Sequence, residues 1–166
     1  MASILVACVG NMFLGDDGFG VEVARRLTTC SMPDGVRVVD FGIRSYDLAY
    51  AMMEEWDLVL LVDAVPRGGQ AGTVYLIEPD LAEIDSALET SAVDGHTMNP
   101  AAVFRLVKAL GGELPRVLIV GCEPAPAEDD TGMEDTMGLS LPVQAGVEEA
   151  LRLIEQRCAD EIKPAA

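Results

Sequence analysis

Three residues of this chain carry side chains that can bind a metal ion or move a proton. Asp17 ends the glycine-rich segment 10–17, Asp63 follows the apolar run 58–62, and His96 is the single histidine. Two carboxylates and one imidazole form a three-ligand set that leaves coordination positions open for water or substrate. Such oxygen and nitrogen donors suit zinc, nickel or a similar divalent ion. The residue types therefore predict a catalytic or transfer site.

Each of the three residues also has an ordinary structural interpretation. Asp17 stands where a carboxylate favours a helix N-terminus, and a histidine in a loop is often a capping or surface residue. Asp63 is harder to explain, because a carboxylate that ends a buried strand must be paired, hydrogen-bonded or metal-bound. The three structural explanations would have to coincide at one end of one sheet, which favours a shared site.

The elements that position these residues follow from an alternation of apolar runs and amphipathic segments. Strands are expected at 3–9, 36–39, 58–62, 73–77 and 116–120, and helices at 19–27, 46–55, 81–88, 100–109 and 142–157. The connection between the third and fourth strands is too short for a helical crossover, so the fourth strand should be antiparallel or lie at an edge.

This order predicts an α/β fold: a three-layer sandwich with a mostly parallel, twisted sheet of about five strands and helices on both faces. Residues 1–166 should form a single domain, with 158–166 as a disordered tail. In such sheets functional groups gather beyond the carboxyl ends of the strands, where Asp17, Asp63 and His96 are expected to lie.

Composition narrows the classes of partner. With 11 basic and 28 acidic residues the formal charge is −17, which opposes nucleic-acid binding and favours cationic partners or metal ions. No segment approaches the ~20 apolar residues of a membrane helix, and no cleavable leader is recognisable, so a cytoplasmic protein without membrane contact is expected. The four cysteines are widely spaced and are expected to be buried thiols, and the acidic stretch 123–135 a solvated or mobile surface loop.

Two other chemistries fit the residues poorly. The segment Gly10–Gly15 matches neither dinucleotide nor phosphate loop patterns, and aspartates at the helix entrance would repel phosphate. Cys122 ends a strand and could meet His96, but no G-x-S-x-G nucleophile motif is present and a buried inert thiol is the default.

The segment Gly10-Asn-Met-Phe-Leu-Gly-Asp-Asp-Gly-Phe-Gly20 resembles the signature of the hydrogenase maturation proteases. Val62-Asp63-Ala64 and His96 fall where that family has its second and third metal-contacting residues, so the likeness extends over nearly the whole chain. The resemblance implies an endopeptidase that removes the C-terminal extension of a nickel-iron hydrogenase large-subunit precursor after nickel insertion. Asp17, Asp63 and His96 would contact nickel carried by the substrate, with no permanent organic cofactor, although the isolated protein could hold another divalent ion.

The resemblance also implies substrate-recognition roles for Asn11, Asp40 and Gly42. The family's second motif commonly reads D-G-G-T, whereas this chain has Asp40-Phe-Gly-Ile43, so Asp40 and Gly42 fit and the other two positions do not. Many relatives also have Glu at the position of Asp17, which leaves open whether Asp16 shares its role. The segment 41–48 could mark a subgroup with its own hydrogenase partner.

Two further functions are compatible with the same three residues. A general metallopeptidase would carry its own zinc and cleave short peptides, whereas a nickel-binding accessory protein would cut nothing. A small-molecule-binding α/β domain would instead show affinity for nucleotides. The maturation endopeptidase remains the leading hypothesis.

Overall fold

A computed structural model describes residues 1–80, 100–126 and 138–163 of the chain. In chain order the elements are β1 (Ile4–Val9), the 3-10 helix η1 (Gly15–Gly18), α1 (Phe19–Leu27), β2 (Val36–Gly42), α2 (Ser45–Met52), β3 (Leu58–Ala64), β4 (Val74–Ile77), α4 (Pro100–Ala109), β5 (Val117–Cys122) and α5 (Leu141–Ile162).

The strands form one sheet in the order β2-β1-β3-β5-β4. The first four strands of this order pair in parallel, and β4 pairs antiparallel with β5 at the edge. The parallel strands β1, β3 and β5 are buried almost throughout, as expected for strands covered on both faces. The predicted α/β sandwich is confirmed, and β4 is both antiparallel and an edge strand.

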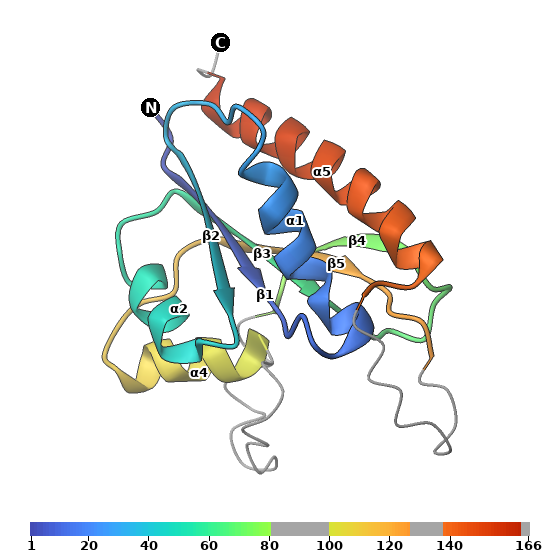
Figure 1. The fold of residues 1–166 in the computed structure, drawn as a ribbon. Coiled ribbons are helices and arrows are strands. Elements are labelled where there is room, and N and C mark those ends of the chain that lie inside the picture. The colour runs from blue at the N-terminus through green and yellow to red at the C-terminus, as the bar shows by residue number, and fades with distance from the viewer. Residues whose placement is uncertain (81–99, 127–137, 164–166) are drawn as a thin grey trace.

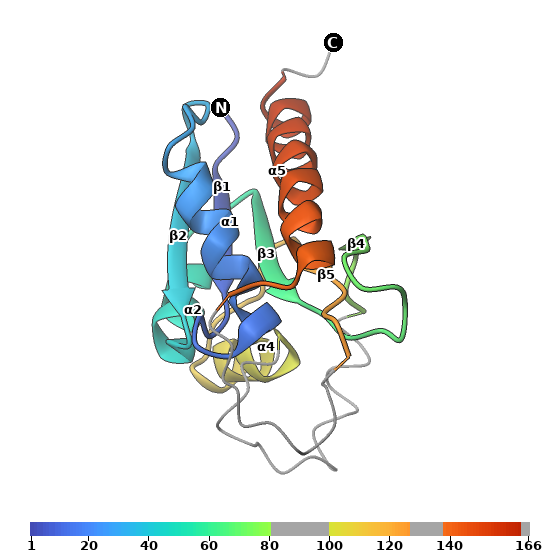
Figure 2. The ribbon, with the colours of Figure 1, turned by 45° about the vertical axis from the view of Figure 1, so that its right-hand side comes forward.

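Helices cover both faces of the sheet (Figure 1). On one face α1 and α5 pack on alternate residues of the central strands, with Phe19, Leu60 and Ile154 fully buried between the layers. On the other face α2 and α4 pack on the intervening strand residues, with Leu61 and Phe104 in that second core. The turned view in Figure 2 shows α1 and α5 on one side of the sheet and α4 on the other.

The last helix is longer than predicted. A disordered tail over 158–166 is wrong for Cys158–Ile162, which continue α5 to Ile162. The reason is packing, because the Cys158 side chain is fully buried against the same core as Ile154.

Three other expectations have different outcomes. Cys8, Cys122 and Cys158 are buried as predicted, but Cys30 is exposed beyond the end of α1, where no layer covers it. The helix predicted at 81–88 lies outside the described residues. Within the described ranges, no helix has both the length and the apolar character that crossing a membrane requires.

Candidate functional site

The candidate site lies at the carboxyl ends of β1 and β3. The chain leaves β1 toward β2 on one side, while β3 and β5 continue the sheet on the other. A reversal of strand order of this kind leaves a crevice between the two strand ends, where ligands bind in open α/β sheets. The loop after β1 carries Asp17 in η1, and Asp63 is the penultimate residue of β3.

Glycines bring the loop after β1 close to the strand ends. Gly10 has φ +143°, a conformation that side chains rarely adopt, and a Cβ there would collide with the carbonyl oxygen of Asp17. A Cβ on Gly20 would collide with the carbonyl oxygen of Val9 and lie 2.7 Å from that of Val62. Backbone therefore packs on backbone, and η1 and the start of α1 rest directly on the ends of β1 and β3.

Asp63 is a buried carboxylate beside a second carboxylate. Asp63 is 4% exposed. Burial, and after it the negative charge of Asp17, raises the pKa of Asp63 to about 8, against the lowering effect of a hydrogen bond from the backbone of Ala64. Asp63 therefore holds a proton over much of the neutral pH range, and a cation placed between the two carboxylates would displace it.

Asp17 is partly buried and is held by its own loop. Its Oδ2 accepts a hydrogen bond of 2.8 Å from the backbone N–H of Asn11. No other hydrogen bond to this carboxylate occurs in the described part of the chain, so its remaining lone pairs are available to a ligand. A carboxylate with free lone pairs near a buried protonated one can bind a divalent ion or activate water.

Asp16 has a different role from its neighbour. Its Oδ1 accepts from the backbone N–H of Ser140 at 2.7 Å, while its Oδ2 accepts from the Ser140 hydroxyl at 2.9 Å and from the backbone N–H of Ala125 at 2.8 Å. These bonds tie η1 to the segment after β5 and to the start of α5. Both oxygens are occupied, which favours Asp17 over Asp16 as the residue that meets a ligand.

The three residues that the resemblance assigns to substrate recognition lie beside this crevice. Asn11 is the second residue after β1, and its Oδ1 accepts from the N–H of Phe13 at 3.0 Å. Asp40 Oδ1 accepts from the N–H of Gly42 at 2.8 Å, and the carbonyl of Gly42 accepts from the N–H of Gly10 at 3.0 Å. The turn after β2 is thereby joined to the loop that carries Asp17.

Arg44 stabilises the same turn through hydrogen bonds to its backbone. Its Nη2 donates to the carbonyl of Asp40 at 2.6 Å and its Nε to the carbonyl of Phe41 at 3.2 Å. Asp47 accepts from its Nη1 at 3.2 Å. Asp40 is exposed, and its carboxylate stabilises the tight turn at Gly42, which has φ +54°.

Glu123 is a buried acid, although it belongs to a stretch whose many acidic residues predict exposure to solvent. The acidic stretch 123–135 is expected to be solvated, but its first residue is 4% exposed. Its carboxylate accepts from the backbone N–H of Arg67 at 2.8 Å, from that of Gly68 at 3.0 Å and from the Tyr75 hydroxyl at 2.9 Å. Burial opposes its charge, but these bonds together lower the pKa of Glu123. Glu123 thus anchors the loop between β3 and β4, and only its place at the end of a buried strand, like that of Asp63, could have indicated this.

His96, the third predicted ligand, lies outside the described residues. No group of three or more potential metal-ligating side chains occurs in residues 1–80, 100–126 and 138–163. Cys122 is fully buried, and burial, then Asp16 and Glu123, raise the pKa of its thiol to about 11. A thiol that is protonated at neutral pH and closed to solvent is a poor nucleophile.

The fold and the crevice define a doubly wound α/β protein with a carboxylate pair at the switch point of its sheet. A family model described as hydrogenase maturation protease matches residues 21–157. The chain belongs to this family, whose members are hydrolases that act in hydrogenase maturation.

Individual proteins are similar over most of the chain. A Methanocaldococcus jannaschii protein assigned to the hydrogenase maturation proteases is 32% identical over 91% of this chain and 93% of its own length. The crystal structure of a [NiFe] hydrogenase maturation protease from Thermococcus kodakarensis is 25% identical, has a TM-score of 0.64 and covers 95% of this chain and 93% of the other. The Escherichia coli hydrogenase maturating endopeptidase has a TM-score of 0.74 at 24% identity, over 96% of this chain and 94% of the other, and supports the fold.

Proposed function

We propose that this protein is the endopeptidase that removes the C-terminal extension of a nickel-iron hydrogenase large-subunit precursor once nickel has been inserted. Membership of the hydrogenase maturation proteases supports the general activity. The observation that carries the finer proposal is the pair formed by buried Asp63 and the neighbouring Asp17, because burial and the charge of Asp17 both favour a proton or a cation on Asp63.

In this proposal nickel arrives as part of the substrate. Asp17, Asp63 and His96 contact the ion while the thiolates of the precursor still hold it, and the chain needs no permanent metal or organic cofactor. An empty precursor would leave Asp63 protonated and the crevice without a cation. Binding of the loaded precursor would release that proton, so the same residues would distinguish loaded from empty substrate.

Hydrolysis then uses water, the residues of the crevice and the nickel ion that the substrate brings. The bound ion polarises the scissile carbonyl, and water adds to its carbon while one carboxylate of the pair accepts the water's proton. The tetrahedral species collapses with cleavage of the C–N bond, and the carboxylate returns the proton to the leaving amine. Asn11, Asp40 and Gly42 lie at the carboxyl ends of β1 and β2 and are proposed to bind the substrate backbone.

Co-expression with a hydrogenase precursor tests the proposal. The chain is produced with the nickel-iron large-subunit precursor encoded in the same genome, in nickel-containing medium, and the intact mass of the large subunit is measured. Loss of the C-terminal extension with nickel present, and its retention without nickel, is the expected result. An extension that stays in place under both conditions would contradict the protease assignment and leave a nickel-binding accessory role.

A second measurement separates the proposal from a general metallopeptidase. The purified chain should contain little tightly bound metal and should not cleave short peptides, because its metal and its binding energy come from the folded precursor. Stoichiometric zinc together with turnover of short peptides would overturn the proposed source of the metal.

A further inference from the structure

Large apolar side chains are exposed on two segments beside the candidate site. Met12, Phe13 and Leu14 are each about half exposed or more, with Phe13 at 58%. Ile43, Tyr46 and Tyr50 are 63%, 62% and 58% exposed. Most of the exposed large apolar residues in the described part of the chain belong to these segments or to Met53 just after them. Scattered exposed apolar residues are normal, but a local concentration indicates an interaction surface.

The first segment belongs to the loop that carries Asp17. The N–H of Leu14 donates to the carbonyl of Asn11 at 3.1 Å, and the N–H of Asp17 donates to the carbonyl of Leu14 at 3.1 Å. The side chains of residues 12–14 are exposed to solvent, whereas Asp17 in the same loop is partly buried and its charge acts on Asp63. A peptide bound at the carboxylate pair would therefore lie against the loop that carries these exposed apolar side chains.

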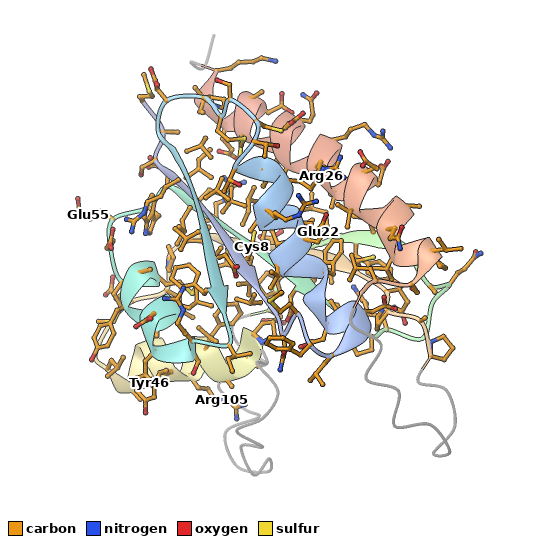
Figure 3. The ribbon with its side chains drawn as sticks, viewed as in Figure 1. Cys8, Glu22, Arg26, Tyr46, Glu55 and Arg105 are labelled. Atoms are coloured by element: carbon orange, nitrogen blue, oxygen red, sulfur yellow. The ribbon has the colours of Figure 1, made fainter. Side chains whose placement is uncertain are left out.

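The second segment is joined to the first through the backbone. The Gly10–Gly42 hydrogen bond places Ile43 directly beside the start of the loop after β1. Tyr46 and Tyr50 follow in α2 one helical turn apart and share a face. Figure 3 shows Tyr46 at the outer edge of the molecule, beyond α2. The six residues form a strip that runs from the candidate site along α2, called here the apolar strip.

Charge sets the apolar strip apart from the rest of the protein. The chain has a formal charge of −17, yet the segment 41–53 contains one arginine and one aspartate, and these form an ion pair between Arg44 and Asp47. The part of the strip on α2 is therefore locally neutral on a strongly acidic protein. A partner that is itself neutral or acidic could approach here with less repulsion than elsewhere.

We infer that the apolar strip is the docking surface for the folded body of the large-subunit precursor, and that it selects which hydrogenase this protein processes. The inference rests on the proposed function, because the scissile segment must reach the crevice while the folded body to which it is attached lies just outside. The strip is the concentration of exposed apolar side chains that adjoins the loop carrying Asp17. Two exposed tyrosines and an isoleucine are side chains suited to act as anchors in a protein interface.

Processing kinetics with paired variants test the inference. Tyr46→Ser combined with Tyr50→Ser removes the two aromatic anchors without touching Asp17 or Asp63. The matched control is Leu76→Ser combined with Leu141→Ser, which removes two exposed apolar side chains from β4 and from the start of α5, on the other side of the molecule from α2 (Figures 1 and 2). Ile43→Ser gives an independent variant that lies in the turn before the helix.

The substrate is the nickel-loaded precursor encoded in the same genome, and both cleavage and equilibrium binding are measured. The double tyrosine variant should raise KM and the dissociation constant at least about tenfold, as loss of two interface anchors predicts, with kcat unchanged. Ile43→Ser should act in the same direction, and the control pair should behave like the wild type. Unchanged KM and binding in the tyrosine variant, or a loss confined to kcat, would overturn the inference.

The remaining outcomes separate docking from cleavage. If the wild type binds the precursor without cutting it and the tyrosine variant binds more weakly, docking stands and the proposed protease activity falls. If the wild type neither binds nor cuts the precursor, both the docking inference and the proposed protease function are wrong. A second copy of this chain is the other molecule that could cover the strip, and sedimentation velocity tests it. If the wild type self-associates, and the tyrosine variant does not but still processes the precursor normally, the strip binds a second copy and the inference is overturned.

Discussion

Asp17 and Asp63 come from elements more than forty residues apart, yet they lie close enough for the charge of one to act on the other. Burial of Asp63, together with that charge, raises its pKa to about 8 from 3.8. The close backbone contacts at Gly10 and Gly20 bring this about, since they allow η1 to rest on the strand ends. The proximity of the two acids is thus a property of the fold.

The first prediction concerns stability and pH. Because the pKa of Asp63 is higher in the folded state, the folded protein keeps a proton that the unfolded chain loses as the pH rises above about 4. The stability that Asp63 contributes should therefore fall from about pH 4 to about pH 8 and then level off. Asp63→Asn removes this dependence. The free energy of unfolding of the variant, relative to that of the wild type, should therefore rise by a few kcal/mol between about pH 4 and about pH 8, measured by urea unfolding at several pH values.

The comparison must be made as a difference between variant and wild type, because other acids also titrate. Asp57 is the control, since hydrogen bonds from the backbone and the hydroxyl of Ser3 lower its pKa. Asp57→Asn should therefore show the opposite sign, with stability lost relative to the wild type as the pH rises through the acid range. A constant difference between Asp63→Asn and the wild type at every pH would show that the pKa of Asp63 is the same in the folded and unfolded chain.

The second prediction concerns processing of the precursor. Asp63→Asn and His96→Ala should leave the chain folded but block removal of the C-terminal extension, because each removes a proposed contact to nickel. Cys122→Ala should process normally, since its thiol is buried and its high pKa keeps it protonated. Intact-mass measurement of the large subunit gives the readout, and circular dichroism checks the fold. Full processing by His96→Ala would remove that histidine from the mechanism.

The third prediction separates the two adjacent aspartates. Asp16→Ala leaves the N–H groups of Ala125 and Ser140 without their acceptor and should destabilise the fold by about 1–3 kcal/mol. Asp17→Asn should change stability little, because an amide oxygen can still accept from the N–H of Asn11. Asp17→Asn should nevertheless abolish processing. Equal loss of processing in Asp17→Asn and in the conservative Asp16→Asn, at equal stability, would mean that the two acids share the role.

The apolar pattern predicted most of the fold, because short, β-branched and leucine-rich apolar runs such as 58–62, bounded by polar residues, are typical of strands buried on both faces. It also indicated Asp63, since a carboxylate at the end of such a run needs a partner. The same argument applied to Glu123, but the surrounding acidic residues concealed it. The hydrogen bonds that occupy Asp16 and the extension of α5 to Ile162 depend on contacts between residues far apart in sequence, and no local pattern reports these contacts.

The fourth prediction tests whether the crevice depends on a close backbone approach. Gly20→Ala places a Cβ against the carbonyl oxygens of Val9 and Val62, which cannot move without disturbing β1 and β3. Overpacking of this kind costs about 1–3 kcal/mol, and the shift of α1 should also move Asp17 away from Asp63. The pKa of Asp63 should then fall, because both burial and the neighbouring charge decrease.

Gly112→Ala is the matched control for this change. Its Cβ would meet the side chain of Met53, which is flexible and partly exposed and can move aside. The control should therefore keep both its stability and the pH dependence that Asp63 causes, whereas Gly20→Ala should lose part of each. A Gly20→Ala protein that is less stable but shows the wild-type pH dependence would mean that α1 adjusts without carrying Asp17 with it, and that the loop after β1 positions Asp17 independently of the helix.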